Sequence, residues 1–173
     1  TTFRRTKWLE IEKFLEVLAI GQLELMHHVL PGMRKRGYGR ILNVASLAAF
    51  APENPGGLYT AVKRFRVSAS RAVWLENKDT GVHVTAVCPG YTVTEFHDVL
   101  GNRAQVNKLP RFMWQQIDDV VREGWSACEK NRPVVITGWC NKLIRTICHL
   151  LPLETVRLIA PRATKRGRMR KAR

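Results

Sequence analysis

Three short apolar runs alternate with segments of helical periodicity, and this alternation restricts the fold of the chain more than any other feature. The apolar runs cover residues 40–45, 82–88 and 134–137. Apolar residues recur every three or four positions in residues 8–30, 59–75 and 118–130. Strands that are joined through helices pair in parallel. We therefore predict an α/β fold, with a parallel sheet of about three strands and flanking helices.

The segments around these runs give further expectations. Large apolar residues widen the helical stripe in the second half of residues 8–30, so we predict that this half is well buried. Pro31 should end that helix, because proline lacks the backbone N–H. A helical hairpin is predicted near the C-terminus, roughly at 141–151 and 153–160. Residues 46–58 and 91–117 should be irregular, the second segment with aromatic anchors at Phe96, Phe112 and Trp114.

The charge of the chain is strongly unbalanced. It has 29 Lys and Arg against 14 Asp and Glu, a net charge of +15. Seven of these cations lie between Arg162 and Arg173, with no acid among them. We predict a domain over residues 1–160 and a disordered basic tail over 161–173. The tail could contact nucleic acid or an anionic membrane nonspecifically, but no aromatic residue interleaves its cations, so base stacking is not supported.

Cysteine usage and hydropathy limit the compartment and the classes of site. The cysteines at positions 88, 128, 140 and 148 form no Cys-x-x-Cys pair, so we predict no metal site and reduced thiols in a cytoplasmic protein. The N-terminal residues have no signal-peptide run. The most apolar later window, 134–153, contains Lys142, Arg145 and His149, so we predict no membrane span. The apolar segment 143–160 could instead lie on a membrane surface, form a packed hairpin or form a subunit interface.

Three residues form a candidate catalytic group. Ser46 follows the first predicted strand, and Tyr59 and Lys63 lie one turn apart on the next helix. A cation near a tyrosine favours its phenolate, which would let Tyr59 exchange a proton near neutral pH. A serine hydroxyl facing that phenol could hold a substrate oxygen. This arrangement suits proton transfer to a carbonyl oxygen while hydride reaches its carbon.

The context of these residues resembles the short-chain dehydrogenase/reductase family from about Ile11 to Trp139. The matching segments are VLPGM (29–33), GRILNVAS (39–46), YTAVK (59–63) and GVHVTAVCPGYTVTEF (81–96). The segment RPVVITGW (132–139) and the hairpin after it resemble a subgroup of uncharacterised bacterial-type reductases. The resemblance implies a partial Rossmann-type sheet, with Tyr59 as general acid/base.

The resemblance also implies roles for other residues. Lys63 would lower the pKa of Tyr59 and bind the nicotinamide ribose, and Ser46 would orient the substrate oxygen. Asn43 would support the cofactor region. The turn formed by Pro89 and Gly90 would pass beside the nicotinamide, with Thr92 and Thr94 near the carboxamide and phosphates. Residues 95–115 would form a substrate loop whose aromatic residues suit an apolar substrate.

Two departures from the family pattern stand out. Leu18 occupies the position of an asparagine that normally supports a water relay to the lysine, so proton delivery would be slower or rerouted. No strand in the sequence is followed by the glycine-rich turn that binds the cofactor pyrophosphate. The chain therefore resembles the C-terminal, catalytic portion of a truncated short-chain dehydrogenase.

These observations lead to one functional hypothesis and one alternative. The hypothesis is an NAD(P)-dependent oxidoreductase acting on a small apolar carbonyl or alcohol, as a homo-oligomer. Basic charge and the subgroup resemblance favour NADP over NAD. The alternative is a catalytically inactive remnant or interaction module with a basic tail.

Overall fold

The structure is a computed structural model, and it describes residues 3–52, 58–95, 107 and 109–151. The second arm of the predicted hairpin, the basic tail, and Phe96 lie outside the described residues.

A three-stranded parallel sheet forms the centre of the fold. Its strands are β1 (Gly39–Val44), β2 (Val82–Cys88) and β5 (Val134–Ile136), in the order β1-β2-β5. In β1 and β2, Gly39 pairs with Val82 and the register continues to Val44 and Val87. β5 pairs with the end of β2, from Ala86↔Val134 to Cys88↔Ile136. The predicted α/β fold with a parallel sheet of three strands is confirmed.

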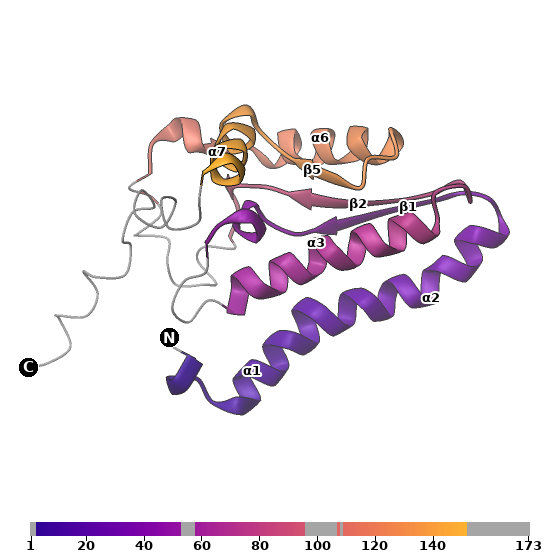
Figure 1. Cartoon of the computed structure of the whole chain (residues 1–173), viewed down its shortest axis with the longest axis horizontal. Coiled ribbons are helices and arrows are strands. Elements are labelled where there is room, and N and C mark those ends of the chain that lie inside the picture. Colours follow the sequence, from indigo (N-terminus) through magenta and orange to yellow (C-terminus); the bar gives the residue numbers. More distant parts are fainter. Residues whose placement is uncertain (1–2, 53–57, 96–106, 108, 152–173) are drawn as a thin grey trace, which may run out of the picture.

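Helices cover both faces of this sheet (Figure 1). One face is covered by α2 (Gly21–Lys35) and α3 (Leu58–Glu76), and the other by α6 (Ile117–Glu129). Short helical segments precede α2: η1 (Phe3–Arg5), α1 (Trp8–Leu15) and the π-helical η2 (Glu16–Ile20). α7 (Trp139–Leu150) follows β5 and lies at the end of the molecule toward which β1 and β2 point. This end is where parallel α/β sheets place their sites.

The core lies between the sheet and α2 and α3. One cluster joins Ala45 and Ala49 to Val67 and to Ala86 of β2. A second cluster, formed by Met26 with Val82 and Val84, fills the opposite end of the sheet. The buried strand β2 is almost entirely enclosed, which explains its continuous apolar sequence.

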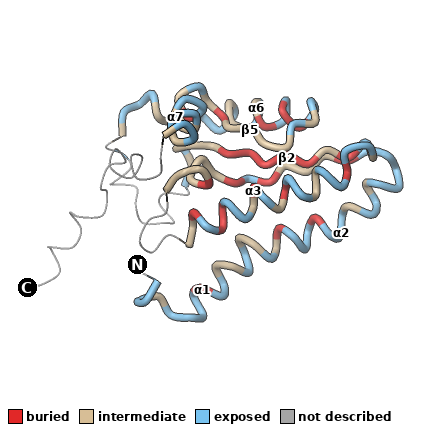
Figure 2. Tube along the Cα trace, in the orientation of Figure 1, coloured by how far each residue is buried: buried red, intermediate tan, exposed pale blue. Residues whose placement is uncertain are grey.

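The outer face of the first helical segment is exposed, contrary to the sequence prediction (Figure 2). Val17 is 69% and Leu25 68% exposed, and Ile20 and Val29 are also exposed. The periodicity correctly indicated an apolar stripe, but only Ile11, Gln22 and Met26 are buried along it. Leu15, Leu18 and Leu30 are half-buried, and among the described residues no element covers the exposed positions of the stripe.

Two local predictions need correction. α2 continues through Pro31 to Lys35. Because Pro31 has no backbone N–H, only the carbonyl of His27 loses its helical hydrogen bond. His27 is exposed, so water can bind that carbonyl instead. The segment predicted to be irregular contains two short paired strands, β3 (Tyr91–Thr92) and β4 (Trp114–Gln115), with η4 (Arg111–Met113) before β4. η3 (Leu47–Phe50) follows β1.

No helix among the described residues is long and apolar enough to cross a membrane.

Candidate active site

The turns after β1 and β2 meet at the carboxyl end of the sheet. Ser46 follows β1 directly, and its hydroxyl accepts a hydrogen bond from the backbone N–H of Ala48 at 3.1 Å, which caps η3. The backbone N–H of Leu47 donates to the carbonyl of Pro89 at 2.8 Å. These contacts hold the Ser46 turn against the Pro89–Gly90 turn.

The structure brings Ser46, Tyr59 and Lys63 together. Tyr59 and Lys63 lie on the first turns of α3, and the Lys63 Nζ atom is 5.5 Å from the centre of the Tyr59 ring. The Ser46 side chain lies close enough to the Tyr59 phenol to lower the pKa of Tyr59. Lys63 is only 6% exposed, and its Nζ donates to the carbonyl oxygen of Val44 at 3.1 Å. A hydroxyl pair and a buried ammonium group thus share one site.

Burial controls the ionisation of this group. It raises the pKa of Tyr59, and the nearby Ser46 side chain and the positive charge of Arg66 only partly offset that effect. Lys63 is not among the causes of this shift, so the expected effect of Lys63 on the pKa of Tyr59 stays a prediction. Burial and then repulsion from Arg66 lower the pKa of Lys63 to about 8. Lys63 can therefore exchange a proton closer to neutral pH than an ordinary lysine.

Arg66 is a second cation of the site that the sequence prediction missed. Its Nη1 atom donates to the carbonyl of Val44 at 2.8 Å, so this one oxygen accepts from both Arg66 and Lys63. The Arg66 Nε–H is buried and has no hydrogen-bond partner. A signal was present in the sequence, because Arg66 lies three residues after Lys63 and therefore shares its helical face.

A polar cluster of Gln115, Thr137 and Asn141 supports the Pro89–Gly90 turn. The side-chain amide of Gln115 is 3.4 Å from the backbone N of Gly90, 3.0 Å from Thr137 Oγ1 and 2.9 Å from Asn141 Nδ2. Thr137 and Asn141 are buried, and a side chain at Gly90 would overlap that of Asn141. Only glycine fits this approach, which fixes the course of the turn.

The other predicted site residues fall into two groups. Thr92 donates from its hydroxyl to the carbonyl of Gly90 at 3.3 Å, and the half-buried Thr94 follows the same turn. Asn43 lies elsewhere: it is buried against α2 and α3, where its Nδ2 donates to Ser70 Oγ at 2.9 Å. Leu18 is half-buried in the π-helical segment η2.

Two further side chains near the site bear on its chemistry. Tyr91 is close enough for its charge to influence the pKa of Tyr59, and its ring centre lies 5.8 Å from that of Trp114. Cys88 is buried, and burial raises the pKa of its thiol to about 12, so it behaves as a small apolar residue. Among the described residues, no group of three or more His, Cys, Asp or Glu could hold a metal ion.

A known protein family matches the part of the chain that carries the candidate catalytic group. The family model described as "short chain dehydrogenase" matches residues 1–104, more than half of the 173 residues. The chain belongs to the short-chain dehydrogenase family. The match includes Ser46, Tyr59 and Lys63 but not β5 or α7.

Relatives within the short-chain dehydrogenase family include named reductases. An acetoacetyl-CoA reductase from Paracoccus denitrificans is 28% identical over 120 residues, which is 67% of this chain and 48% of that protein. A ketoacyl reductase from Nostoc sp. is 36% identical over 108 residues, 62% of this chain and 37% of that protein. The chain thus spans half or less of the length of these two relatives.

Solved structures of other short-chain dehydrogenases share the fold. A short-chain dehydrogenase from Sphingobium yanoikuyae, solved in complex with NADPH, superposes with a TM-score of 0.70 at 25% identity. The match covers 100% of this chain and 62% of the other. A 7beta-hydroxysteroid dehydrogenase gives a TM-score of 0.76 at 23% identity, over 90% of this chain and 59% of the other.

Proposed function

We propose that the chain is the catalytic portion of an NAD(P)-dependent oxidoreductase that interconverts a carbonyl and an alcohol. The observation that carries the proposal is the meeting of Ser46, Tyr59 and Lys63 at the carboxyl end of the sheet. Family membership and the reductase names of relatives support the reaction class.

The side chains of this site fit the nicotinamide end of such a cofactor. The Lys63 ammonium group is a donor suited to the ribose hydroxyls, and the Pro89–Gly90 turn offers backbone groups beside it. Lys63 and this turn would hold the nicotinamide end of the reduced cofactor, which would supply the hydride for the carbonyl carbon. A neighbouring fold was solved with NADPH, which together with the positive charge of the chain favours NADP over NAD.

Tyr59 and Ser46 handle the oxygen of the substrate. In the reductive direction, the Tyr59 hydroxyl donates its proton to the carbonyl oxygen as the C–H bond forms, and Ser46 donates a hydrogen bond to the same oxygen. In the oxidative direction, the Tyr59 phenolate accepts the proton of the alcohol. Burial disfavours that phenolate, and the positive charge of Arg66 partly offsets the cost.

Lys63 can return the proton to Tyr59. Its pKa of about 8 lets it lose a proton near neutral pH, which an unperturbed lysine does poorly. Leu18 offers no polar group at the position where the family pattern has an asparagine. Proton supply to Lys63 therefore reaches the site by another route or more slowly.

An apolar substrate and a homo-oligomeric protein complete the proposal. The aromatic residues Tyr91, Phe112 and Trp114 belong to the segments that follow the site, and Phe112 is 63% exposed. Leu25 and Val29 of α2 and Phe65 of α3 are exposed apolar side chains that suit contact with a second copy. We place the protein in the cytoplasm, on the basis of its four free cysteines.

A reductase assay tests the proposed function. The protein that contains this chain at its full natural length is incubated with a small apolar ketone, and NADPH oxidation is followed by absorbance. Ser46→Ala should lower kcat about 100-fold, because it removes a donor to the reacting oxygen. Ser68→Ala, at an exposed position on α3, is the matched control and should match wild type. Equal rates for the two variants would refute the role of Ser46.

A further inference from the structure

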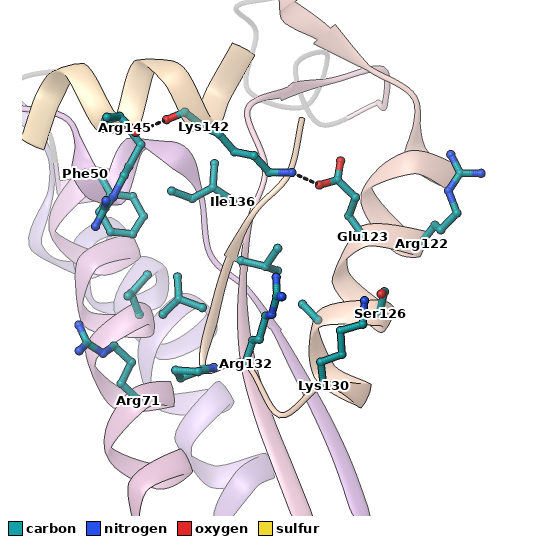
Figure 3. Close-up of a pocket in the computed structure, with 16 residues that line it drawn as sticks. Phe50, Arg71, Arg122, Glu123, Ser126, Lys130, Arg132, Ile136, Lys142 and Arg145 are labelled. Carbon is teal, nitrogen blue, oxygen red and sulfur yellow. Dashed lines mark hydrogen bonds and ion pairs between the residues drawn. The ribbon is translucent and has the colours of Figure 1, made fainter. Parts of the chain in front are cut away.

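A basic groove runs along the free edge of β5 (Figure 3), and its lining residues include none of Ser46, Tyr59 and Lys63. We call it the β5 groove. Its cavity volume is about 720 Å³. The floor is β5 itself, and the walls are α3 on one side and α6 on the other, with α7 closing one end. No strand of the described part of the chain pairs with this edge.

The backbone of β5 presents hydrogen-bonding groups to the groove. The carbonyl of Pro133 accepts from Ala86 N, and Thr137 N donates to Cys88 O, so the odd-numbered residues direct their backbone groups toward β2. Backbone groups alternate sides along a strand in a parallel ladder. The N–H and C=O groups of Val134 and Ile136 therefore face the groove, where an added strand could bind them.

Six cations line the groove against one acid. They are Arg71 from α3, Arg122 and Lys130 from α6, Arg132 before β5, and Lys142 and Arg145 from α7. The single acid, Glu123, is already engaged, because it bonds Lys142 Nζ at 2.7 Å and the backbone N of Gly138 at 2.9 Å. Arg71, Lys130 and Arg132 have no ion pair with any described residue, so the groove keeps a clear positive excess.

Apolar side chains occupy the remaining lining. Val134 and Ile136 pack on the α3 side, with Val67 and Phe50. The Arg145 guanidinium lies 5.7 Å from the centre of the Phe50 ring and borders this apolar surface. A phosphate chain could use the cations but could satisfy neither the apolar wall nor the backbone donors and acceptors of β5.

We propose that the β5 groove binds an acidic, extended peptide segment of another protein as an added strand. Strand addition would supply the missing partners of Val134 and Ile136, and side chains of an added strand alternate between its two faces. Apolar residues on one face would contact Val67 and Phe50. Acidic residues on the other would meet Arg122 and Lys130 of α6. A sequence that alternates acidic and apolar residues fits both walls.

Charge disfavours two other occupants. A second copy pairing edge to edge would bring two sets of six cations together. The chain's own C-terminal residues 161–173 carry cations and no acid, so they repel the groove rather than complement it. The positive lining favours an occupant that brings negative charge, as an acidic segment of a different protein does.

Fluorescence anisotropy with a labelled Glu-Val-Glu-Val-Glu-Val-Glu peptide tests the proposal on the full chain. A Glu-Pro-Glu-Pro-Glu-Pro-Glu peptide has the same charge but cannot form a strand, and it should bind at least about tenfold more weakly. The Arg122→Glu/Lys130→Glu variant removes the two cations that would meet the acidic residues and should lose about tenfold or more in affinity. The Arg34→Glu/Lys78→Glu variant changes the net charge equally at exposed positions outside the groove and should bind like wild type.

A backbone variant separates strand addition from simple attraction between charges. Val134→Pro removes an N–H that faces the groove and leaves the ladder with β2 intact. It should therefore weaken binding of the Glu-Val peptide. The fold should stay unchanged, which circular dichroism checks. Three outcomes would each overturn the proposal. The two peptides could bind equally well, or neither could bind at all. Oligothymidine could displace the Glu-Val peptide while the Val134→Pro variant still binds that peptide fully. If the wild-type chain forms a dimer that the Val134→Pro substitution dissociates, the occupant of the groove is a second copy and the proposal is wrong.

Discussion

Replacing Lys63 with methionine should stabilise the protein while removing a proposed catalytic group. Lys63 is 6% exposed, and the wild-type fold must bury its ammonium group in charged form below pH 8. Methionine has similar length and no charge. The one backbone acceptor that Lys63 leaves, Val44 O, keeps its hydrogen bond from Arg66 at 2.8 Å. The substitution therefore removes a buried charge without leaving an unsatisfied acceptor.

The magnitude follows from the pKa of Lys63. Lowering it from 10.5 in the unfolded chain to about 8 in the folded protein costs about 3 kcal/mol of stability, at ~1.4 kcal/mol per pH unit. Between pH 8 and 10.5 the unfolded chain binds more protons at this site, so wild-type stability rises with pH across that window. The cost is fully present below pH 8 and disappears near pH 10.5. Lys63→Met should therefore gain about 2–3 kcal/mol at pH 7 and little at pH 10.

Urea unfolding of wild type and Lys63→Met at pH 6, 7, 9 and 10 measures this difference. Lys78→Met, at an exposed lysine in the turn after α3, is the matched control and should stay within about 0.5 kcal/mol of wild type at every pH. The reasoning would be refuted if Lys63→Met is no more stable than wild type at pH 7. It would also be refuted if the gain in stability at pH 10 is as large as the gain at pH 7.

Three further predictions follow from the site and the exposed faces. The 173-residue chain alone should bind NADPH with a Kd well above micromolar, because Lys63 and the Pro89–Gly90 turn hold only the nicotinamide end. Fluorescence titration checks this affinity, and a micromolar Kd would contradict the prediction. Gly90→Ala should destabilise the fold by about 1–3 kcal/mol in thermal unfolding, and adding Asn141→Ala should recover most of that loss if their overlap is the cause. The chain should dimerise or aggregate in light scattering, with Leu25→Glu reducing association; a monodisperse wild-type monomer would contradict this.

Sequence patterns located the sheet and the proposed catalytic group because both depend on local spacing. β2 is enclosed on both faces, so its residues form a continuous apolar run that needs no alignment to find. Tyr59 and Lys63 are one helical turn apart, and Ser46 directly follows a strand, so their meeting follows from the order of elements.

The same patterns failed where the outcome depends on partners distant in sequence. Periodicity identified the apolar stripe that includes Val17 and Leu25, but it carries no information on whether another element covers that stripe. The pKa of Tyr59 depends on the balance between burial and nearby charge, and spacing alone cannot give that balance. Gln115 comes from a short strand in a segment without periodicity, so its contact with Gly90 left no sequence signal.

The central claim is that Tyr59 transfers the proton in an NAD(P)-dependent carbonyl reduction, and the Tyr59→Phe variant of the full natural protein tests it most directly. Single-turnover oxidation of NADPH and the NADPH dissociation constant are measured on the same preparation. Phenylalanine keeps the ring beside Lys63 and removes only the proton donor. We predict a rate at least about 100-fold below wild type, with cofactor affinity close to wild type. Wild-type turnover in Tyr59→Phe would contradict the account.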